Sequence, residues 1–339
     1  MISLAGTRYA DKIARIRAGA YAKGDFILAD AKDADLSGGV PTTGLRRDAQ
    51  GRPGKARTRP EFLDQMRGLL AQGQIDILLA SASNIEALGG AFIGSPVAAA
   101  FRGNEATDMW GQCRGGRYRE TPSIPYRGAS LAKAPAALCL YSITFNNDAQ
   151  ADAASLTAYA AFRAEAEAAG VAHFLEVFNP NVVTGFTPAE TGAFVNDCIC
   201  RAMGSLTRAE RPQFLKVAYN GPDALQELVA HDPSLVVGVL GGGGGTHRDT
   251  FELVAQAERF GARLALFGRK INMAEDQPTL IAWMRRVADG QATPAAAVRG
   301  YHANLTTLGL TPDRELAYDL VITDDILRLA ADQSQPEHP

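Results

Sequence analysis

Eight short apolar runs, each followed by a polar loop and an amphipathic stretch, constrain the fold of this chain more than any other feature of its sequence. Near-continuous hydrophobicity is typical of parallel strands that are covered on both faces. The stretches between the runs have helical spacing, as where Phe62, Met66 and Leu69 fall on one stripe. The predicted strands are residues 26–30, 75–80, 97–101, 136–145, 173–178, 214–219, 235–240 and 263–267.

Eight strands that alternate with helices favour a closed barrel over an open sheet. We therefore predict an α/β fold, a (β/α)8 TIM barrel, as a single domain over residues 1–330, with a disordered tail at 331–339. A helix over residues 8–20 is expected to cap the barrel floor. The loops after strand 1 (31–59) and strand 3 (102–135) are long, and loops of this length on a compact barrel are usually functional or form interfaces.

Charge and composition exclude several classes of protein. The net charge is only -3, so no global field attracts nucleic acid or an anionic membrane. No apolar run reaches membrane-spanning length, and the N-terminus lacks the apolar core of a secretory signal. We expect a cytoplasmic protein with neither nucleic acid nor a membrane as a partner. The cysteines form no CxxC pair and the histidines no HExxH motif, so we predict no metal site and no cofactor.

Lys216 lies in the middle of a predicted strand, between Leu215 and Val217. Side chains alternate across a strand, so this ammonium group points at the barrel interior or at the helices, and it is almost never buried there without a partner. Desolvation lowers the pKa of a lysine, and a neutral amine can attack a carbonyl to form an iminium. The alternative is a lysine at the strand end that reaches solvent or pairs with a carboxylate.

Glu176 is a second ionisable residue within an apolar run, on the preceding strand at 173–178. Consecutive strands of such a barrel are neighbours, so Glu176 and Lys216 should lie at equivalent depth. One interpretation is an internal salt bridge, which is weak evidence for stability. The other, which a position at the barrel mouth favours, is a nucleophile beside a general acid/base.

A run of five glycines, 241–245, follows the strand at 235–240 and leads into a capping-box-like helix start at Thr246 and Asp249. Glycine backbone can approach a ligand closely, and a helix N-terminus attracts phosphate. The alternative is a merely flexible turn, but the loops after strands 7 and 8 are the usual phosphate site of this architecture. The predicted ligands are Gly241, Gly242, Gly243, Gly244 and Arg269.

Other polar residues follow strands 1 and 3. Asp30, at the end of strand 1, is predicted to assist catalysis, although it is equally typical of an ordinary strand-end carboxylate. Lys32 and Arg102 are predicted to bind substrate, and Asp33 is also expected at the catalytic mouth of the barrel. An arginine cluster in the second long loop is more typical of a solvated loop or a subunit contact; its members are Arg114, Arg117, Arg119 and Arg127.

The motifs Phe-Leu-Glu at 174–176 and Leu-Lys-Val at 215–217, with the glycine loop and the Gly-Arg pair at 268–269, resemble the tagatose-bisphosphate aldolase branch of the class I aldolases. The deoxyribose-phosphate aldolase superfamily shares the same plan. The resemblance covers residues 172–275 and implies that Lys216 forms a Schiff base, that Glu176 is the acid/base and that a phosphate binds at the glycine loop. The family also has a lysine on strand 4, and residues 136–145 contain none.

The sequence therefore predicts a metal-independent class I aldolase, a carbon–carbon lyase that acts on a ketose phosphate or related sugar phosphate. Two alternatives stay open: a sugar-phosphate isomerase or epimerase that uses the same Lys216 and Glu176, and a non-catalytic barrel that senses sugar phosphates. The expected partner is a small phosphorylated sugar with one or two phosphates, and the expected assembly is a homo-oligomer.

Overall fold

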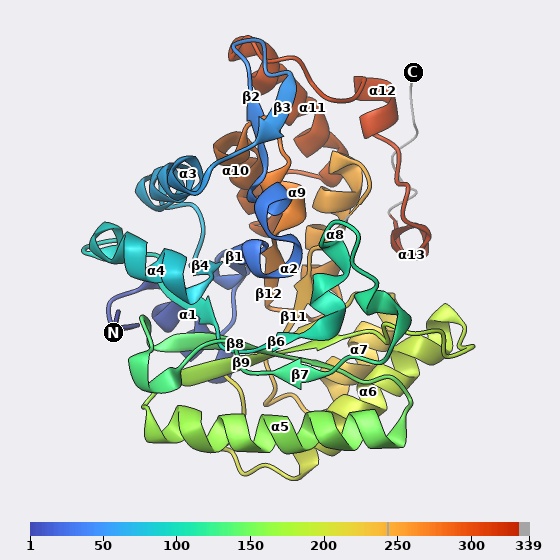
Figure 1. The fold of residues 1–339 in the computed structure, drawn as a ribbon. Coiled ribbons are helices and arrows are strands. Elements are labelled where there is room, and N and C mark those ends of the chain that lie inside the picture. Colours follow the sequence, from blue (N-terminus) through green and yellow to red (C-terminus); the bar gives the residue numbers. More distant parts are fainter. Residues whose placement is uncertain (243, 332–339) are drawn as a thin grey trace.

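The computed structural model describes residues 1–242 and 244–331, and in it eight parallel strands close into a barrel (Figure 1). Around the barrel the strands follow the order β1-β12-β11-β10-β9-β8-β5-β4. Each overlaps one of the eight predicted runs, so the predicted TIM barrel is confirmed. The strands are β1 (Ile27–Lys32), β4 (Ile77–Ala80), β5 (Ala98–Arg102), β8 (Leu138–Thr144), β9 (Ala172–Phe178), β10 (Leu215–Val217), β11 (Val237–Leu240) and β12 (Leu264–Phe267).

Helices surround the barrel and cover the outer faces of its strands. Several begin with a capping box, in which a threonine and an acidic residue three positions later satisfy each other's backbone N–H groups. The longer helices are α1 (Arg8–Arg17), α3 (Arg59–Gln72), α4 (Ala82–Leu88), α5 (Ala149–Ala168), α6 (Pro188–Gly204), α7 (Pro222–His231), α8 (His247–Arg259), α10 (Gln277–Ala288) and α11 (Pro294–Thr307). The short helices are α2 (Asp35–Gly38), α9 (Arg269–Asn272), α12 (Leu316–Asp319) and α13 (Asp325–Arg328).

The two faces of each barrel strand bury different sets of side chains. On β1, Ile27, Ala29 and Ala31 point into the barrel interior, whereas Leu28 packs in the layer between barrel and helices. This alternation follows from the two-residue period of a strand. It decides which polar residues of a strand can reach the cavity at the barrel mouth.

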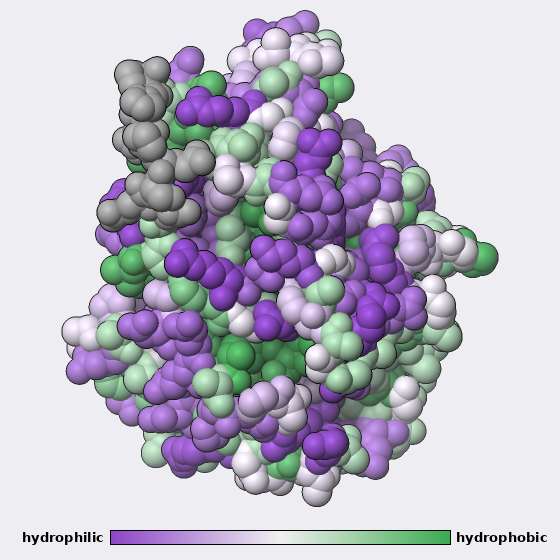
Figure 2. Space-filling view, turned by 180° about the vertical axis from the view of Figure 1, so that it is seen from behind, coloured by the Kyte–Doolittle hydropathy of each residue, from purple (hydrophilic) through white to green (hydrophobic). Residues whose placement is uncertain are grey.

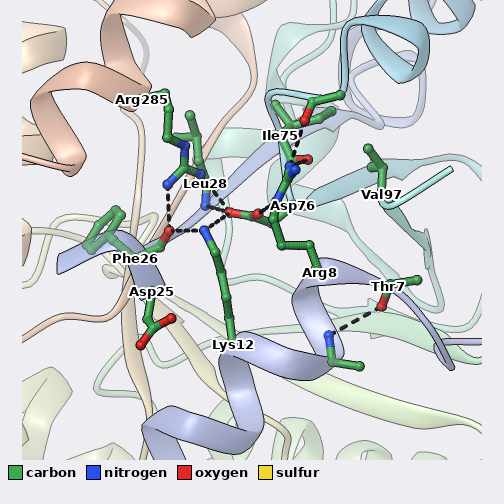
Figure 3. A network of polar contacts seen from close by, with 12 residues as sticks. Thr7, Arg8, Lys12, Asp25, Phe26, Leu28, Ile75, Asp76, Val97 and Arg285 are labelled. Atoms are coloured by element: carbon green, nitrogen blue, oxygen red, sulfur yellow. Dashed lines mark hydrogen bonds and ion pairs between the residues drawn. The ribbon is translucent and has the colours of Figure 1, made fainter. Parts of the chain in front are cut away.

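Helix α1 closes the barrel floor, as predicted, with Tyr9 and Ile13 packed against the interior side chains. Beside it, the buried carboxylate of Asp76 accepts hydrogen bonds from the Leu28 N–H at 2.8 Å, Lys12 Nζ at 3.1 Å and Arg285 Nη2 at 2.7 Å, with Arg8 as a further partner (Figure 3). Several cations around one carboxylate satisfy a charge that would otherwise be costly to bury. This network ties the first helix and the last quarter of the chain to the barrel floor.

Both long loops form structure of their own at the carboxyl ends of the strands. The loop after β1 contains the hairpin of β2 (Leu45–Arg47) and β3 (Pro53–Ala56), which projects from the barrel (Figure 1). Residues 103–137, all described, form no α-helix. They contain short 3-10 turns and the two-stranded ribbon of β6 (Glu105–Ala106) and β7 (Pro125–Tyr126). We call residues 103–137 the insertion.

Figure 2 shows one face of the molecule, on which hydrophilic residues are widespread and the most extensive hydrophobic area lies near the centre. Among the described residues, no helix is long and apolar enough to cross a membrane. The predicted tail at 331–339 lies outside the described residues apart from residue 331 and stays a prediction.

Candidate active site

A cavity of about 370 Å³ opens at the carboxyl ends of the barrel strands. This volume falls within the range of small-molecule pockets, and this end of a TIM barrel carries the active site in essentially all characterised enzymes of the fold. Strands, loops and the insertion all contribute to its wall. The polar residues that line it are Asp33, Ser37, Arg102, Asp108, Gln112, Arg119, Glu176, Asn179, Lys216 and Arg269.

Lys216 and Glu176 face each other across neighbouring strands. Their Cα atoms are direct partners in the β9–β10 register, and Lys216 Nζ lies 2.5 Å from Glu176 Oε1. Both side chains are almost fully buried, at 6% and 2% exposure. Below them Phe174 and Phe214 stack in the barrel interior, which shows that this face of both strands points inward. The structure thus brings together the amine and the carboxylate at the equal depth expected from the sequence.

Arg102, at the end of β5, extends this pair into a buried chain of alternating charges. Its guanidinium contacts Glu176 Oε2 at 3.3 Å and Asp33 Oδ2 at 2.6 Å. It also donates to Ser142 Oγ at 2.7 Å, and that hydroxyl donates to Glu176 Oε2 at 2.6 Å. The order Lys216–Glu176–Arg102–Asp33 therefore contains two cations and two anions.

The charges in this chain reinforce one another. Burial raises the pKa of Asp33, but attraction to Arg102 and Lys216 outweighs burial and holds that pKa below its ordinary value. Burial lowers the pKa of Arg102, but Asp33 and Glu176 outweigh it and raise the pKa. Asp33 and Arg102 are therefore both charged at neutral pH.

The predicted placement of Asp30 and Lys32 at the cavity is wrong. Asp30 shares the outward face of β1 with Leu28, and its carboxylate pairs with Lys32 Nζ at 2.9 Å in the layer between barrel and helices. Lys32 Nζ also donates to Asn272 Oδ1 at 2.6 Å and to the Gln277 side chain at 2.9 Å. Neither residue lines the cavity. The strand alternation explains this, since Ala29 and Ala31 take the inward positions, and Asp33 beyond the strand end reaches the cavity instead.

The glycine loop meets the cavity at its first two residues, Gly241 and Gly242. A Cβ atom at Gly241 would lie 2.4 Å from the ring of Phe267, so only glycine fits this close approach. Gly242 has φ +61°, a backbone conformation that favours glycine. The predicted ligand Gly244 is not among the cavity-lining residues, and Gly243 lies outside the described residues. The predicted capping box at Thr246 is present at the start of α8.

Two arginines meet the cavity beside this loop. Arg269, the first residue of α9, lines the cavity as predicted, whereas Arg119 comes from the insertion and belongs to the cluster interpreted as a solvated loop or a subunit contact. Partial burial lowers the pKa of Arg269, and the charge of Arg119, which lines the same cavity, lowers it further. Within the described part of the chain, neither has a carboxylate within ion-pair distance. No local sequence signal distinguishes Arg119 from its neighbours, because its position depends on the path of the insertion.

A second buried polar cluster supports the helix that follows the glycine loop. His247 Nδ1 lies 2.6 Å and His302 Nε2 lies 2.8 Å from the same Asp319 oxygen, and the other Asp319 oxygen accepts the His247 N–H. These three are the described residues whose side chains could together hold a metal ion. No sequence motif predicts this cluster, because its residues come from three separate helices, α8, α11 and α12. The hydrogen bonds of the Asp319 carboxylate join these three helices.

Comparison with known proteins gives matches of fold only. No family model and no curated protein matches the chain. An archaeal fructose 1,6-bisphosphate aldolase is 16% identical with a TM-score of 0.59, over 83% of this chain and 99% of that one. An archaeal fructose-1,6-bisphosphate aldolase solved with its catalytic lysine bound to a carbinolamine intermediate is 17% identical with the same TM-score, over 83% and 100%. A fructose-bisphosphate aldolase from Slackia heliotrinireducens is 12% identical with a TM-score of 0.59, over 88% and 90%. The narrower resemblance to the tagatose-bisphosphate branch stays a prediction.

Proposed function

We propose that this protein is a class I aldolase that cleaves or forms a carbon–carbon bond in a sugar phosphate through a Schiff base on Lys216. The observation that carries the proposal is the buried contact of 2.5 Å between Lys216 Nζ and Glu176 Oε1 in the cavity at the barrel mouth. Support comes from the fold, because the solved structures that match it include Schiff-base fructose-bisphosphate aldolases.

The first half of the reaction makes the imine. Glu176 takes a proton from the Lys216 ammonium, and the neutral amine adds to the ketone carbon of the substrate to give a carbinolamine. Glu176 returns the proton as the hydroxyl group leaves as water, and an iminium forms. The distance of 2.5 Å permits the first proton transfer without a relay.

The second half breaks the carbon–carbon bond. Glu176, again a carboxylate, removes the proton from the hydroxyl on the far side of that bond, and the electron pair of the bond moves into the iminium. This step releases an aldehyde and leaves an enamine on Lys216. Protonation of the enamine carbon and hydrolysis then release the ketone and restore the amine. The iminium accepts the electrons, so the proposed steps use only groups of the protein and water.

The surrounding residues position these groups. Arg102 and Ser142 both bind Glu176 Oε2, which leaves Oε1 directed at Lys216. Asp33 is held as a carboxylate in the cavity, where it can accept a hydrogen bond from a substrate hydroxyl. We assign the phosphate to the backbone of Gly241 and Gly242 together with Arg269.

Borohydride trapping tests the proposal. Wild-type protein incubated with a panel of ketose phosphates and sodium borohydride should gain the mass of the reduced adduct on the peptide that contains Lys216. Lys216→Met should gain no mass and release no aldehyde, whereas Lys133→Met, which changes an exposed lysine, should behave as wild type. Near wild-type cleavage by folded Lys216→Met would refute the mechanism. Turnover without any adduct would instead favour the isomerase or epimerase, and ligand binding without turnover would favour the sensor.

A further inference from the structure

We infer that the cavity has one anion subsite, which Arg119 of the insertion completes, and that the substrate is a ketose monophosphate whose phosphate lies on the half bound to Lys216. The aldehyde that is released then carries no phosphate. This inference rests on the proposed function and specifies its substrate class.

The subsite is the end of the cavity formed by Gly241, Gly242, Arg119 and Arg269. Both arginines reach the cavity, and both are accessible to solvent. The charge of Arg119 also lowers the pKa of Arg269, after partial burial, and within the described chain no carboxylate pairs with either of them. Two guanidinium groups that line one cavity without a carboxylate partner form a suitable site for a phosphate, which guanidinium binds in a bidentate manner.

The insertion holds Arg119 at this position. The Arg119 side chain packs over Gly111, where any Cβ atom would collide with it. Asp108 in the same segment accepts hydrogen bonds from Ser123 Oγ at 2.7 Å and from Thr144 Oγ1 at 3.0 Å, and Thr144 is the last residue of β8. The insertion is thus attached to the barrel rim, and it supplies Arg119 to the cavity wall.

The rest of the cavity disfavours a second phosphate. The cation there is Arg102, and Asp33, Glu176 and Ser142 already occupy its guanidinium. A phosphate at this end would face the Asp33 and Glu176 carboxylates, and like charges repel strongly where water is excluded. Among the cavity residues that the structure describes, free positive charge is therefore confined to the subsite.

Strand order assigns the phosphate to the ketone half. The glycine loop follows β11, which neighbours β10 with Lys216 on one side of the barrel. Glu176 lies on β9, the neighbour of β10 on the other side. A substrate that extends from the subsite across Lys216 therefore has its phosphate on the subsite side of the carbonyl carbon. Its scissile bond lies on the other side of that carbon, toward Glu176.

The test uses matched pairs of ketohexose 1-phosphates and 1,6-bisphosphates that differ only in the distal phosphate, with each stereoisomer measured for kcat/KM and for borohydride adduct. The best 1-phosphate should exceed its own bisphosphate in kcat/KM at least about tenfold, the scale of one unfavourable charge contact. The corresponding 6-phosphate should be poorer than the 1-phosphate. A bisphosphate or 6-phosphate that surpasses its 1-phosphate, with adduct still on Lys216, would overturn this inference and leave the aldolase intact. No adduct with any sugar would refute the aldolase itself.

Arg119 is tested separately with dihydroxyacetone phosphate, which contains only the ketone half. Arg119→Ala should require about tenfold more of this ligand for half-maximal trapping, because it removes a charge-assisted hydrogen bond. Trapping by unphosphorylated dihydroxyacetone should not change. Arg117→Ala is the matched control, since Arg117 lies in the same insertion but pairs with Glu120 at 2.7 Å and does not line the cavity. An unchanged ligand requirement in Arg119→Ala, or an equal loss in Arg117→Ala, would overturn the role of Arg119.

Discussion

Replacing Glu176 by glutamine gives the sharpest test of how the proposed chemistry depends on the buried ion pairs of Lys216, Glu176, Arg102 and Asp33. The substitution keeps the size of the side chain but removes its ability to take a proton from Lys216. Glu176 Oε2 accepts hydrogen bonds from Ser142 at 2.6 Å and from Arg102 at 3.3 Å, so the amide oxygen of glutamine should take this position. The amide NH2 group, which only donates, then faces Lys216 Nζ.

The size of the effect follows from this geometry. A positioned general acid/base contributes about 100- to 10,000-fold to a rate, so the loss should raise the activation barrier by about 3 to 5 kcal/mol. Both imine formation and bond cleavage use this group, so kcat and the rate of adduct trapping should fall together. KM for the sugar phosphate should change little, because Arg269 and the glycine loop remain intact.

The assay couples aldehyde release to a reductase and follows adduct formation by mass spectrometry in parallel. Glu167→Gln, an exposed change on α5, is the matched control and should retain wild-type rates. Circular dichroism and thermal unfolding should show that Glu176→Gln is folded. If folded Glu176→Gln traps substrate and turns over within threefold of wild type, Glu176 is not the acid/base and the proposed proton transfers are incorrect.

Four further substitutions test the cavity wall, the outward face of β1 and the barrel floor. Asp33→Asn should lower kcat/KM about tenfold in the coupled assay, because it weakens the ion pair with Arg102. Asp30→Asn should lower the free energy of unfolding in urea by about 3 kcal/mol and leave kcat/KM unchanged. A loss of kcat/KM in Asp30→Asn without a loss of stability would instead place Asp30 in the active site. Gly241→Ala should raise KM about tenfold in the same assay, since its methyl group would collide with Phe267 and displace the loop, and an unchanged KM would contradict the assigned subsite. Asp76→Ala should cost about 3 to 5 kcal/mol of unfolding free energy. Burial raises the pKa of Asp76, but Arg285 and other cations outweigh burial and lower it. The stabilisation is therefore present above about pH 4 and is lost as the pH falls through the lower folded pKa. If the difference in unfolding free energy between wild type and Asp76→Ala does not narrow in acid, this cause is contradicted.

The barrel and its central pair could be predicted because their signals are local. Apolar runs and helical stripes recur along the whole chain, and the order of strands in a barrel makes Lys216 and Glu176 neighbours without further information. Asp30 was misplaced because a charged residue near the end of a barrel strand was expected to face the cavity, whereas the face of β1 that carries Leu28, Asp30 and Lys32 points outward. Asp33 follows the inward positions Ala29 and Ala31 in the two-residue alternation, and it is this carboxylate that lines the cavity.

Other parts of the site depend on tertiary structure that leaves no periodic signal. Arg119 reaches the cavity through short 3-10 turns and a two-residue ribbon, and such turns have no pattern that predicts their path. His247 and His302 meet at Asp319 from helices far apart in the chain. The expected homo-oligomer and cytoplasmic location are not tested by the fold and stay predictions.

The hydrogen bonds of the last described segment have a consequence for anyone who redesigns this protein. Asp319 binds the first turn of α8, Thr246 Oγ1 donates to the Val321 carbonyl at 2.7 Å, and the Thr323 N–H donates to Asp249 at 2.8 Å. Residues that come after the eighth strand therefore hold in place the first turn of α8, into which the glycine loop leads. A deletion that spares every barrel strand but removes residues 316–328 should weaken phosphate binding, so a minimal catalytic fragment must extend beyond the last barrel strand to α13.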